Sequence, residues 1–101
     1  MITLRQQEAL RQIKRDIEHG KNHPSKEISA AYKDIPDEWI HAAAAAIDII
    51  IDSKEGKQAW NIIWAWQNVV ERESTVVASL KGIFDAVKAC KIHSKYATPG
   101  S

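Results

Sequence analysis

The chain has 101 residues, 45% of them hydrophobic and 27% charged, which is the composition of one folded domain and excludes global disorder. Lys and Arg number 14 against 13 Asp and Glu, and the resulting formal charge of +1 excludes the strong positive field of a bulk nucleic-acid binder. Cys90 is the one cysteine, so a disulfide-stapled secreted scaffold is excluded and we expect a cytoplasmic protein.

We expect no membrane-directing segment in this sequence. The first residues, MITLRQQEALRQIKRD, lack the continuous apolar run of a signal peptide. The longest apolar candidate, WIHAAAAAIDIII, is interrupted by His41 and Asp48 and is shorter than the roughly 18 residues that cross a bilayer. Residues 1–95 are therefore predicted to form a single helical domain, and residues 96–101 a disordered tail.

The first predicted helix begins after Thr3 and runs to about residue 19. Thr3 is a plausible N-cap, with Gln6 in the capping-box position three residues later. Gly20 fits the left-handed position just beyond a helix end. Apolar residues recur at helical spacing at Ile2, Ala9, Leu10, Ile13 and Ile17.

Two more helices are predicted on either side of Pro36. Ser25 can cap a short helix, SKEISAAYK, which must end before the proline. Pro36 also suits the start of the next helix, where Asp37 and Glu38 lie at the positive end of the helix dipole. Trp39 flanks the predicted core stripe of this third helix, and its alanines let a neighbouring helix approach closely. That stripe consists of Ile40, Ala43, Ala44, Ile47, Ile50 and Ile51.

The stretch KQAWNIIWAWQNVVER, residues 57–72, is predicted to be a helix that is apolar on two sides. Trp60 and Trp64 lie four residues apart on a second facet, roughly 120° or more around the helix from Trp66. A helix with two apolar sides needs several neighbours, and some of these can belong to another molecule. Its core stripe is predicted to be Ala59, Ile62, Ile63, Trp66, Val69 and Val70.

The sequence after Arg72 leaves two arrangements open. Ser74 or Thr75 could cap a separate last helix, which favours a compact antiparallel bundle. No Gly or Pro intervenes, however, and one uninterrupted helix of about 40 residues would span roughly 60 Å, which is natural only in a dimer or another assembly. Either way, the last stripe consists of Val76, Val77, Leu80, Ile83, Phe84, Val87 and Cys90.

Small residues occupy the side of this last helix that faces away from its main stripe. They are Ala78, Gly82, Ala86 and Ala89. A glycine inside a helix costs about 1 kcal/mol relative to alanine, and close contact with another helix would offset that cost. A surface glycine without consequence is the alternative, and it is the one we expect.

No catalytic or metal-binding signature is present, so we expect neither an enzyme nor a cofactor. Asp48 and Asp52 are interpreted as the polar edge of the third helix. His19 and His23 have metal-ligand spacing, but Gly20 and Pro24 indicate that the helix has ended there, so the two side chains would not share a helical face. Cys90 lies on an apolar stripe, where a lone cysteine behaves as a small hydrophobic residue.

A helix-turn-helix is an alternative for SKEISAAYK and DEWIHAAAAAI. The first turn of its reading helix carries Asp37, Glu38 and Trp39 instead of Arg, Lys, Asn or Gln, which are the residues that contact bases and phosphates. A DNA-binding regulator of this kind is therefore a secondary hypothesis. A small helical enzyme is a third, and it would require a concave pocket with converging titratable groups.

The predicted fold is all-α, with four or five helices in a compact bundle that includes a long C-terminal helix or a helical hairpin. The predicted function is a small non-enzymatic regulator, an inhibitor, adaptor or immunity-type protein, whose apolar helix faces dock on a larger protein or on a second copy. Charges around Glu71, Arg72 and Glu73 would set the orientation. The competing interpretation is that all four tryptophans fill the core. The predicted docking residues are Trp39, Trp60, Trp64, Gln67 and Glu71.

Overall fold

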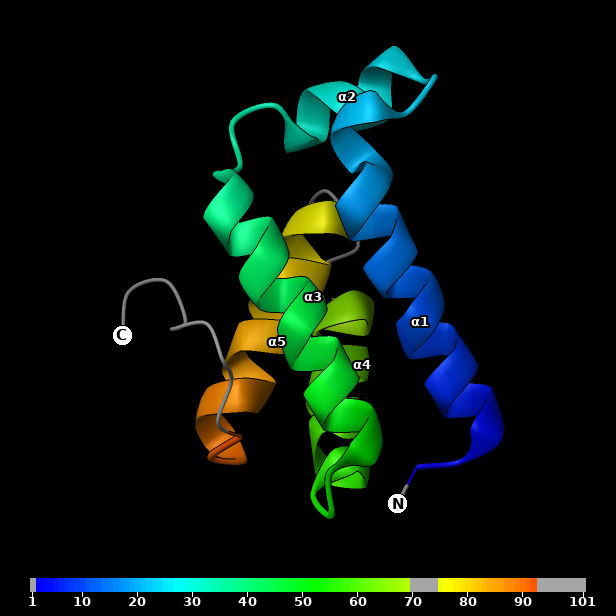
Figure 1. Ribbon diagram of the computed structural model, residues 1–101, viewed down its shortest axis with the longest axis vertical. Coiled ribbons are helices and arrows are strands. Elements are labelled where there is room, and N and C mark those ends of the chain that lie inside the picture. Colours follow the sequence, from blue (N-terminus) through cyan, green and yellow to red (C-terminus); the bar gives the residue numbers. More distant parts are fainter. Residues whose placement is uncertain (1, 70–74, 93–101) are drawn as a thin grey trace.

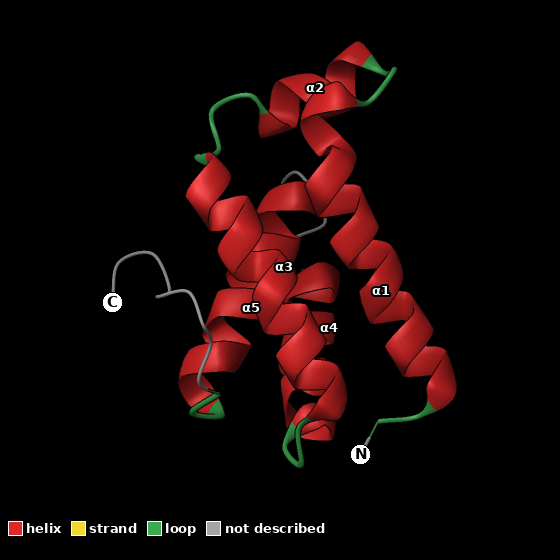
Figure 2. Cartoon of the chain, in the orientation of Figure 1, coloured by secondary structure: helices red, strands yellow, loops and turns green. Residues whose placement is uncertain are grey.

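The computed structural model describes residues 2–69 and 75–92. Every regular element in this described part is helical (Figure 2), so the predicted all-α bundle is confirmed. The elements are α1 (Leu4–His19), the short 3-10 helix η1 (Gly20–Asn22), α2 (Lys26–Tyr32), α3 (Asp37–Asp52), α4 (Gly56–Val69) and α5 (Thr75–Ala89).

Helix α3 runs through the middle of the bundle (Figure 1). It descends beside α1, and α4 and α5 lie behind both of them, while α2 crosses the upper end between α1 and α3. Among the described helices, α4 and α5 share the most extensive contact. The position of α3 makes it the element on which the other long helices pack.

Helices α4 and α5 form a hairpin. Helix α4 ends at Val69, and α5 begins at Thr75 and packs back along it. The prediction of one uninterrupted helix of about 40 residues is therefore wrong. The apolar faces of α4 and α5 cover each other within one chain. The predicted cap at Ser74 lies outside the described residues.

The ends of α1 confirm one local prediction and overturn another. The Thr3 hydroxyl accepts from the Gln6 N–H at 3.1 Å, and the Gln6 side chain accepts from the Thr3 N–H at 3.0 Å, which is the predicted capping box. Gly20 has φ −59° and ψ −40°, so it is not left-handed. The ring of Tyr32 lies where a side chain on Gly20 would project, so this glycine is required for packing.

The boundaries around Pro36 agree with the sequence pattern. The Ser25 hydroxyl accepts from the Ile28 N–H at 3.5 Å and starts α2. Pro36 is the N-cap of α3, and Asp37 and Glu38 occupy its first turn as predicted. All members of the predicted α3 stripe are buried: Ile40, Ala43, Ala44, Ile47, Ile50 and Ile51.

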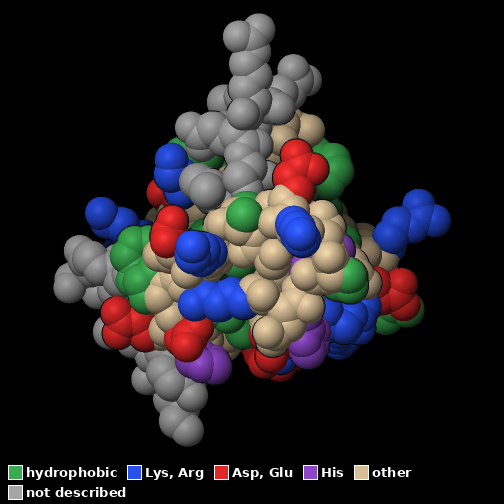
Figure 3. Space-filling model, turned by 90° about the horizontal axis from the view of Figure 1, so that it is seen from above, with side chains coloured by type: hydrophobic (Ala, Val, Ile, Leu, Met, Phe, Trp, Pro, Cys, Tyr) green, Lys and Arg blue, Asp and Glu red, His purple; other side chains and the backbone are tan. Residues whose placement is uncertain are grey.

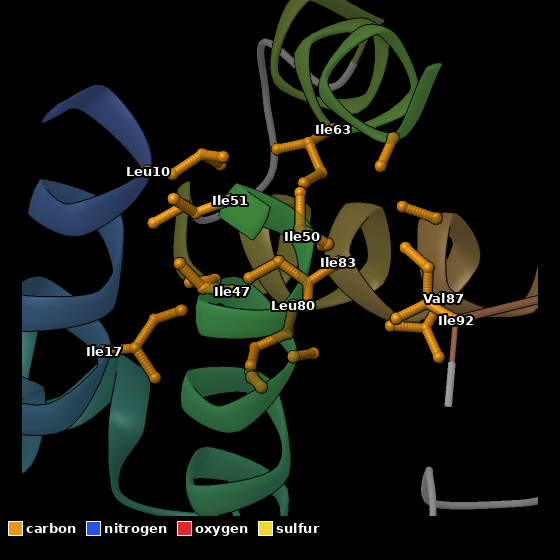
Figure 4. Close-up of a cluster of buried hydrophobic side chains, with 14 of the residues drawn as sticks. Leu10, Ile17, Ile47, Ile50, Ile51, Ile63, Leu80, Ile83, Val87 and Ile92 are labelled. Carbon is orange, nitrogen blue, oxygen red and sulfur yellow. The ribbon is translucent and has the colours of Figure 1, made fainter. Parts of the chain in front are cut away.

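The core is formed by aliphatic side chains that converge from four helices (Figure 4). Six of its side chains have less than 2% of their surface exposed, and a fully buried aliphatic side chain contributes about 1.5 to 3 kcal/mol relative to an exposed one. These side chains are Leu10, Ile17, Ile47, Ile50, Ile63 and Ile83. The tryptophans take no part in this innermost set.

Gly82 lies where α5 packs closely on α4. Ala78, Gly82 and Ala86 are all buried, whereas Ala89 is exposed. A Cβ atom on Gly82 would lie 3.1 Å from the Cα of Ile63 and 3.3 Å from the Cβ of Trp66. The expectation of a surface glycine is therefore wrong, because the absent side chain lets the two helix backbones approach each other.

A single ion pair joins the outer faces of α1 and α3 in the described part of the chain. The Lys14 ammonium lies 2.8 Å from a carboxylate oxygen of Asp48. The side-chain hydrogen bond to Asp48 raises the pKa of Lys14. Both groups are partly exposed, so the pair contributes no more than about 1 kcal/mol. Asp48 thus belongs to the polar edge of α3, as expected.

None of the described helices is both long and apolar enough to serve as a membrane span. Helix α3 has the longest apolar run, but it is only 16 residues long and carries Asp48 within it. Its apolar surface is covered by α1, α4 and α5.

Candidate functional site

None of the four tryptophan side chains is buried. Trp39 has 39% of its surface exposed and Trp64 has 51% exposed, while Trp60 and Trp66 are half-buried. The interpretation that all four indole rings fill the core is therefore wrong. Large exposed apolar side chains are typical of binding surfaces, so the exposed indoles of Trp39 and Trp64 are candidates for contact with another molecule.

Trp60 and Trp64 form a stacked pair on α4. Their ring centroids lie 5.6 Å apart and their planes are inclined by 17°. Trp60 packs against the core cluster with its other surface, whereas Trp64 projects into solvent. One indole is thus anchored in the fold and holds the other in place, as the second facet predicted from the sequence suggested.

The solvent-facing side of α4 is almost free of charge. Helix α4, GKQAWNIIWAWQNV, contains one charged residue, Lys57, in its first turn. Helix α1, in contrast, exposes both signs along its outer face. Residues Asn61, Trp64, Ala65 and Asn68 are all exposed at i, i+3, i+4 and i+7, and we call them the outer stripe of α4.

Three of these four residues were absent from the sequence prediction. Individually, Asn61, Ala65 and Asn68 do not indicate a binding surface, because amides and alanines are common on helix surfaces. The available signal was the missing charge, since the centres of protein interfaces are depleted in Lys, Glu and Asp. The run without charge from Gln58 to Val70 departs from the usual polar face of a surface helix.

Of the other predicted docking residues, Gln67 lies on the same facet of α4 as the stacked pair, three residues after Trp64, whereas Trp39 lies on α3. The Gln67 amide donates to the Ser79 hydroxyl at 3.4 Å and so ties α4 to α5. Trp39 makes an edge-to-face contact with Phe84, at 6.2 Å between centroids and 88° between planes. Glu71 lies outside the described residues, as do the neighbouring charges predicted to set orientation.

Trp66 joins α4 to α5 at the edge of the core. Its indole N–H donates to a carboxylate oxygen of Asp85 at 3.1 Å, and the Lys81 ammonium lies 5.7 Å from the ring centroid. These contacts satisfy both the polar and the aromatic part of the side chain. Trp66 is therefore a structural residue of the hairpin.

A groove of about 890 Å³ runs between the end of α1, α2 and the upper part of the α4–α5 hairpin. Asp16 accepts a hydrogen bond from Gln12 at 2.9 Å, and Nδ1 of His23 accepts from the Ser25 N–H at 3.0 Å. Seen from above, this end of the molecule shows basic, acidic and histidine side chains interspersed (Figure 3). The titratable residues of the groove are Arg15, Asp16, His19, His23, Glu27 and Tyr32.

Three further features could indicate a catalytic or metal site: clustered metal-ligating side chains, the Cys90 thiol and a second hollow. In the described ranges no group of three or more His, Cys, Asp or Glu side chains is arranged to hold a metal ion. Burial raises the pKa of the half-buried Cys90 thiol, which reduces the thiolate fraction that a nucleophile requires. A second hollow, of about 510 Å³, is bordered by Asp48, Asp52 and Glu55 together with Lys91.

Helix α3 packs on three other helices, and its exposed side is largely acidic. Eight of its residues are buried, and it packs on α1, α4 and α5. A reading helix presents its exposed side to the major groove, and on α3 that side includes Asp48 and Asp52. The exposed part of its first turn presents Asp37, Glu38 and Trp39, two of which would repel phosphates.

Comparison of the chain with protein-family models, curated proteins and solved structures gave no match. The chemistry of the surface itself must therefore support any proposal about function. Within the described residues, the outer stripe of α4 is the surface that departs furthest from an ordinary solvated face.

Proposed function

We propose that this chain is a non-enzymatic, cytoplasmic protein-binding regulator that docks through the outer stripe of α4 on a larger protein or on a second copy. Its action is steric, as in an inhibitor, adaptor or immunity-type protein: it occupies a surface of its partner and excludes other molecules. Trp64 is the anchor, and Trp60 holds the anchor in position.

The observation that carries this proposal is Trp64, half exposed and stacked on Trp60. Tryptophan is enriched among the residues that dominate binding energy, and a fully buried indole removes about 150 to 250 Å² from water. Binding normally costs side-chain entropy, about 0.5 to 1.5 kcal/mol for each immobilised flexible side chain. Because the stack already restricts Trp64, this cost is reduced.

The charge-poor surroundings of Trp64 support a partner that is recognised by shape and apolar contact. Lys57 is the one charge on α4, so steering by long-range electrostatics would be weak. Docking through the outer stripe should therefore change little with ionic strength. A nucleic-acid partner would give the opposite behaviour, because phosphate contacts release counterions and affinity falls steeply with salt.

The alternatives have weaker support. The DNA-binding hypothesis needs α3 as a reading helix, and α3 is the central element of the bundle. The enzyme hypothesis has a groove beside α1 and α2, but Asp16 and His23 in that groove already bond Gln12 and the backbone of Ser25. A catalytic role for them would require those local bonds to be given up.

The test is quantitative affinity capture with a matched control. Wild-type protein, Trp64→Ala and Leu4→Ala are immobilised separately and incubated with a lysate of the cells that express the protein. Leu4 is 72% exposed on α1, so its replacement removes a similar kind of apolar surface at another place. The proposal predicts proteins that bind wild type and Leu4→Ala but are lost with Trp64→Ala. Identical capture by all three would exclude docking through the outer stripe.

A further inference from the structure

We propose that the outer stripe of α4 binds a second copy of the same stripe, with the two α4 helices antiparallel across a two-fold axis that passes between Trp64 and Ala65. This inference rests on the proposed function, since it names the partner of that docking surface. It also implies that self-association covers Trp64, so a larger partner would have to compete with the second copy.

The first argument is the symmetry of the stripe. Asn61 and Asn68 lie equally far from the midpoint between Trp64 and Ala65, and all four are exposed. In an isologous pair, residues beside the axis meet their own copies and residues at equal distances from it exchange partners. Trp64 would therefore meet Trp64 of the second copy, Ala65 would meet Ala65, and Asn61 would meet Asn68.

Each of these pairings is chemically compatible. An Asn side chain both donates and accepts, so two amides can hydrogen-bond each other, which two carboxylates or two ammonium groups cannot do. Two Trp64 rings would extend the existing Trp60–Trp64 stack across the axis. Ala65, beside them, is short enough to allow the two helices to approach to about 8 to 10 Å.

The second argument is charge. The stripe itself carries none, and Lys57 lies about 11 Å along the helix from the midpoint at a rise of about 1.5 Å per residue. In the antiparallel arrangement the two Lys57 side chains would be about 20 Å apart, beyond the Debye length of about 8 Å at physiological salt. The chain has a formal charge of +1, so two copies repel each other little.

The expected association is weak and reversible. Helix α4 has 14 residues and is therefore about 20 Å long, so one face of it is smaller than the roughly 800 Å² per partner of a standard stable interface. We therefore expect dimers at high micromolar concentration and monomers on dilution. A dimer of this strength would release the docking surface when a better partner is present.

Site-directed crosslinking tests the arrangement directly. Ala65→Cys is introduced with Cys90→Ser, because the proposed geometry brings the two Cα atoms of residue 65 to about 5 to 7 Å, the range that a disulfide spans. Ala89→Cys with Cys90→Ser is the matched control, since Ala89 is exposed on α5, away from the stripe. Mild oxidation at near-millimolar concentration should give about tenfold more dimer with Cys at 65 than at 89.

Adding Trp64→Ala to the Ala65→Cys variant should reduce the crosslinked fraction to that of the control. Sedimentation velocity of the wild type should show the average mass rising with concentration. Equal crosslinking at the two positions, together with a monomer at every concentration, would overturn the second copy as partner. Capture that depends on Trp64 would survive that result, so the two proposals can fail independently.

Discussion

Trp60 and Trp64 stack with their centroids 5.6 Å apart, yet one indole packs on the hydrophobic core and the other has 51% of its surface exposed. The two side chains therefore have different roles. Trp60 belongs to the fold and supplies a rigid base, and Trp64 presents an apolar ring to solvent in a fixed position. Helical spacing alone placed them on the same facet, but only the packing distinguishes the base from the anchor.

This difference predicts unequal stability effects. Trp64→Ala should lower the free energy of unfolding by about 1 kcal/mol, because an aromatic pair contributes about 0.5 to 1.5 kcal/mol and little further burial is lost. Trp60→Ala should cost about 2 to 4 kcal/mol, because it also opens space at the edge of the core. Urea unfolding followed by circular dichroism measures both. Equal losses would show that Trp64 is as structural as Trp60.

The contact between Gly82 and Ile63 predicts that α5 tolerates no bulk at this position. Gly82→Val should destabilise the fold by about 2 to 3 kcal/mol, because the nearest atoms belong to the backbone of Ile63 and cannot rotate away. Ala89→Val, on the exposed side of the same helix, controls for helix propensity and should cost less than about 1 kcal/mol. A neutral Gly82→Val would mean that the hairpin is not closely packed.

Gly20→Ala should destabilise the fold, whereas the same change at an ordinary helical glycine stabilises it. The φ and ψ of Gly20 are right-handed helical, so backbone preference alone would favour alanine. The ring of Tyr32 occupies the space that the new methyl group needs, so Gly20→Ala should cost about 1 to 3 kcal/mol. Thermal unfolding of Gly20→Ala, Tyr32→Leu and the double variant gives the coupling. Strict additivity of the two changes would refute the contact.

Tyr32 should make the fold sensitive to alkaline pH. Burial, followed by the nearby charge of Asp16, raises the pKa of Tyr32 to about 12, above its ordinary value near 10. The folded state holds the proton more tightly, so this stabilisation is complete below pH 10 and is lost as the pH rises from about 10 to about 12. The loss should amount to about 1 to 2 kcal/mol, because Tyr32 borders the groove and solvent screens part of the effect.

Tyr32→Phe isolates this effect, because phenylalanine keeps the ring but has no hydroxyl to ionise. Urea unfolding at intervals between pH 9 and about pH 12 should show a smaller decline for the variant than for the wild type. The hydrogen bond to Asp48 raises the pKa of Lys14, so the stabilisation by this ion pair is also lost at alkaline pH. The loss is the same in both proteins and cancels when they are compared. Parallel curves would contradict the raised pKa of Tyr32.

Helical periodicity predicted the parts of the fold that depend on one helix at a time. It identified six of the eight buried residues of α3 and the capping box of Thr3 and Gln6, since both follow from spacing along a single segment. The roles of Gly20 and Gly82 could not be predicted in this way. Each depends on which element lies opposite, Tyr32 in one case and Ile63 in the other, and spacing does not reveal that.

The candidate site was predicted only as far as it depends on spacing along one helix. Trp60 and Trp64 share a facet because they are four residues apart on one helix. The contacts of Trp39 with Phe84 and of Gln67 with Ser79 could not be predicted, because both partners lie on α5 and the sequence left open whether α5 is separate from α4. The uncharged outer stripe, however, is visible in the sequence as part of the uncharged run from Gln58 to Val70.

The central claim, that another molecule covers the outer stripe of α4, is tested most directly by hydroxyl-radical footprinting of Trp64. Oxidation of Trp64 is compared between dilute purified protein and the same protein in a lysate of the cells that express it, with Trp39, 39% exposed beside Phe84, as the internal reference. The proposed function predicts that Trp64 is oxidised at least several-fold more slowly in the lysate while Trp39 is unchanged. Equal protection of both residues, or none of either, would contradict it.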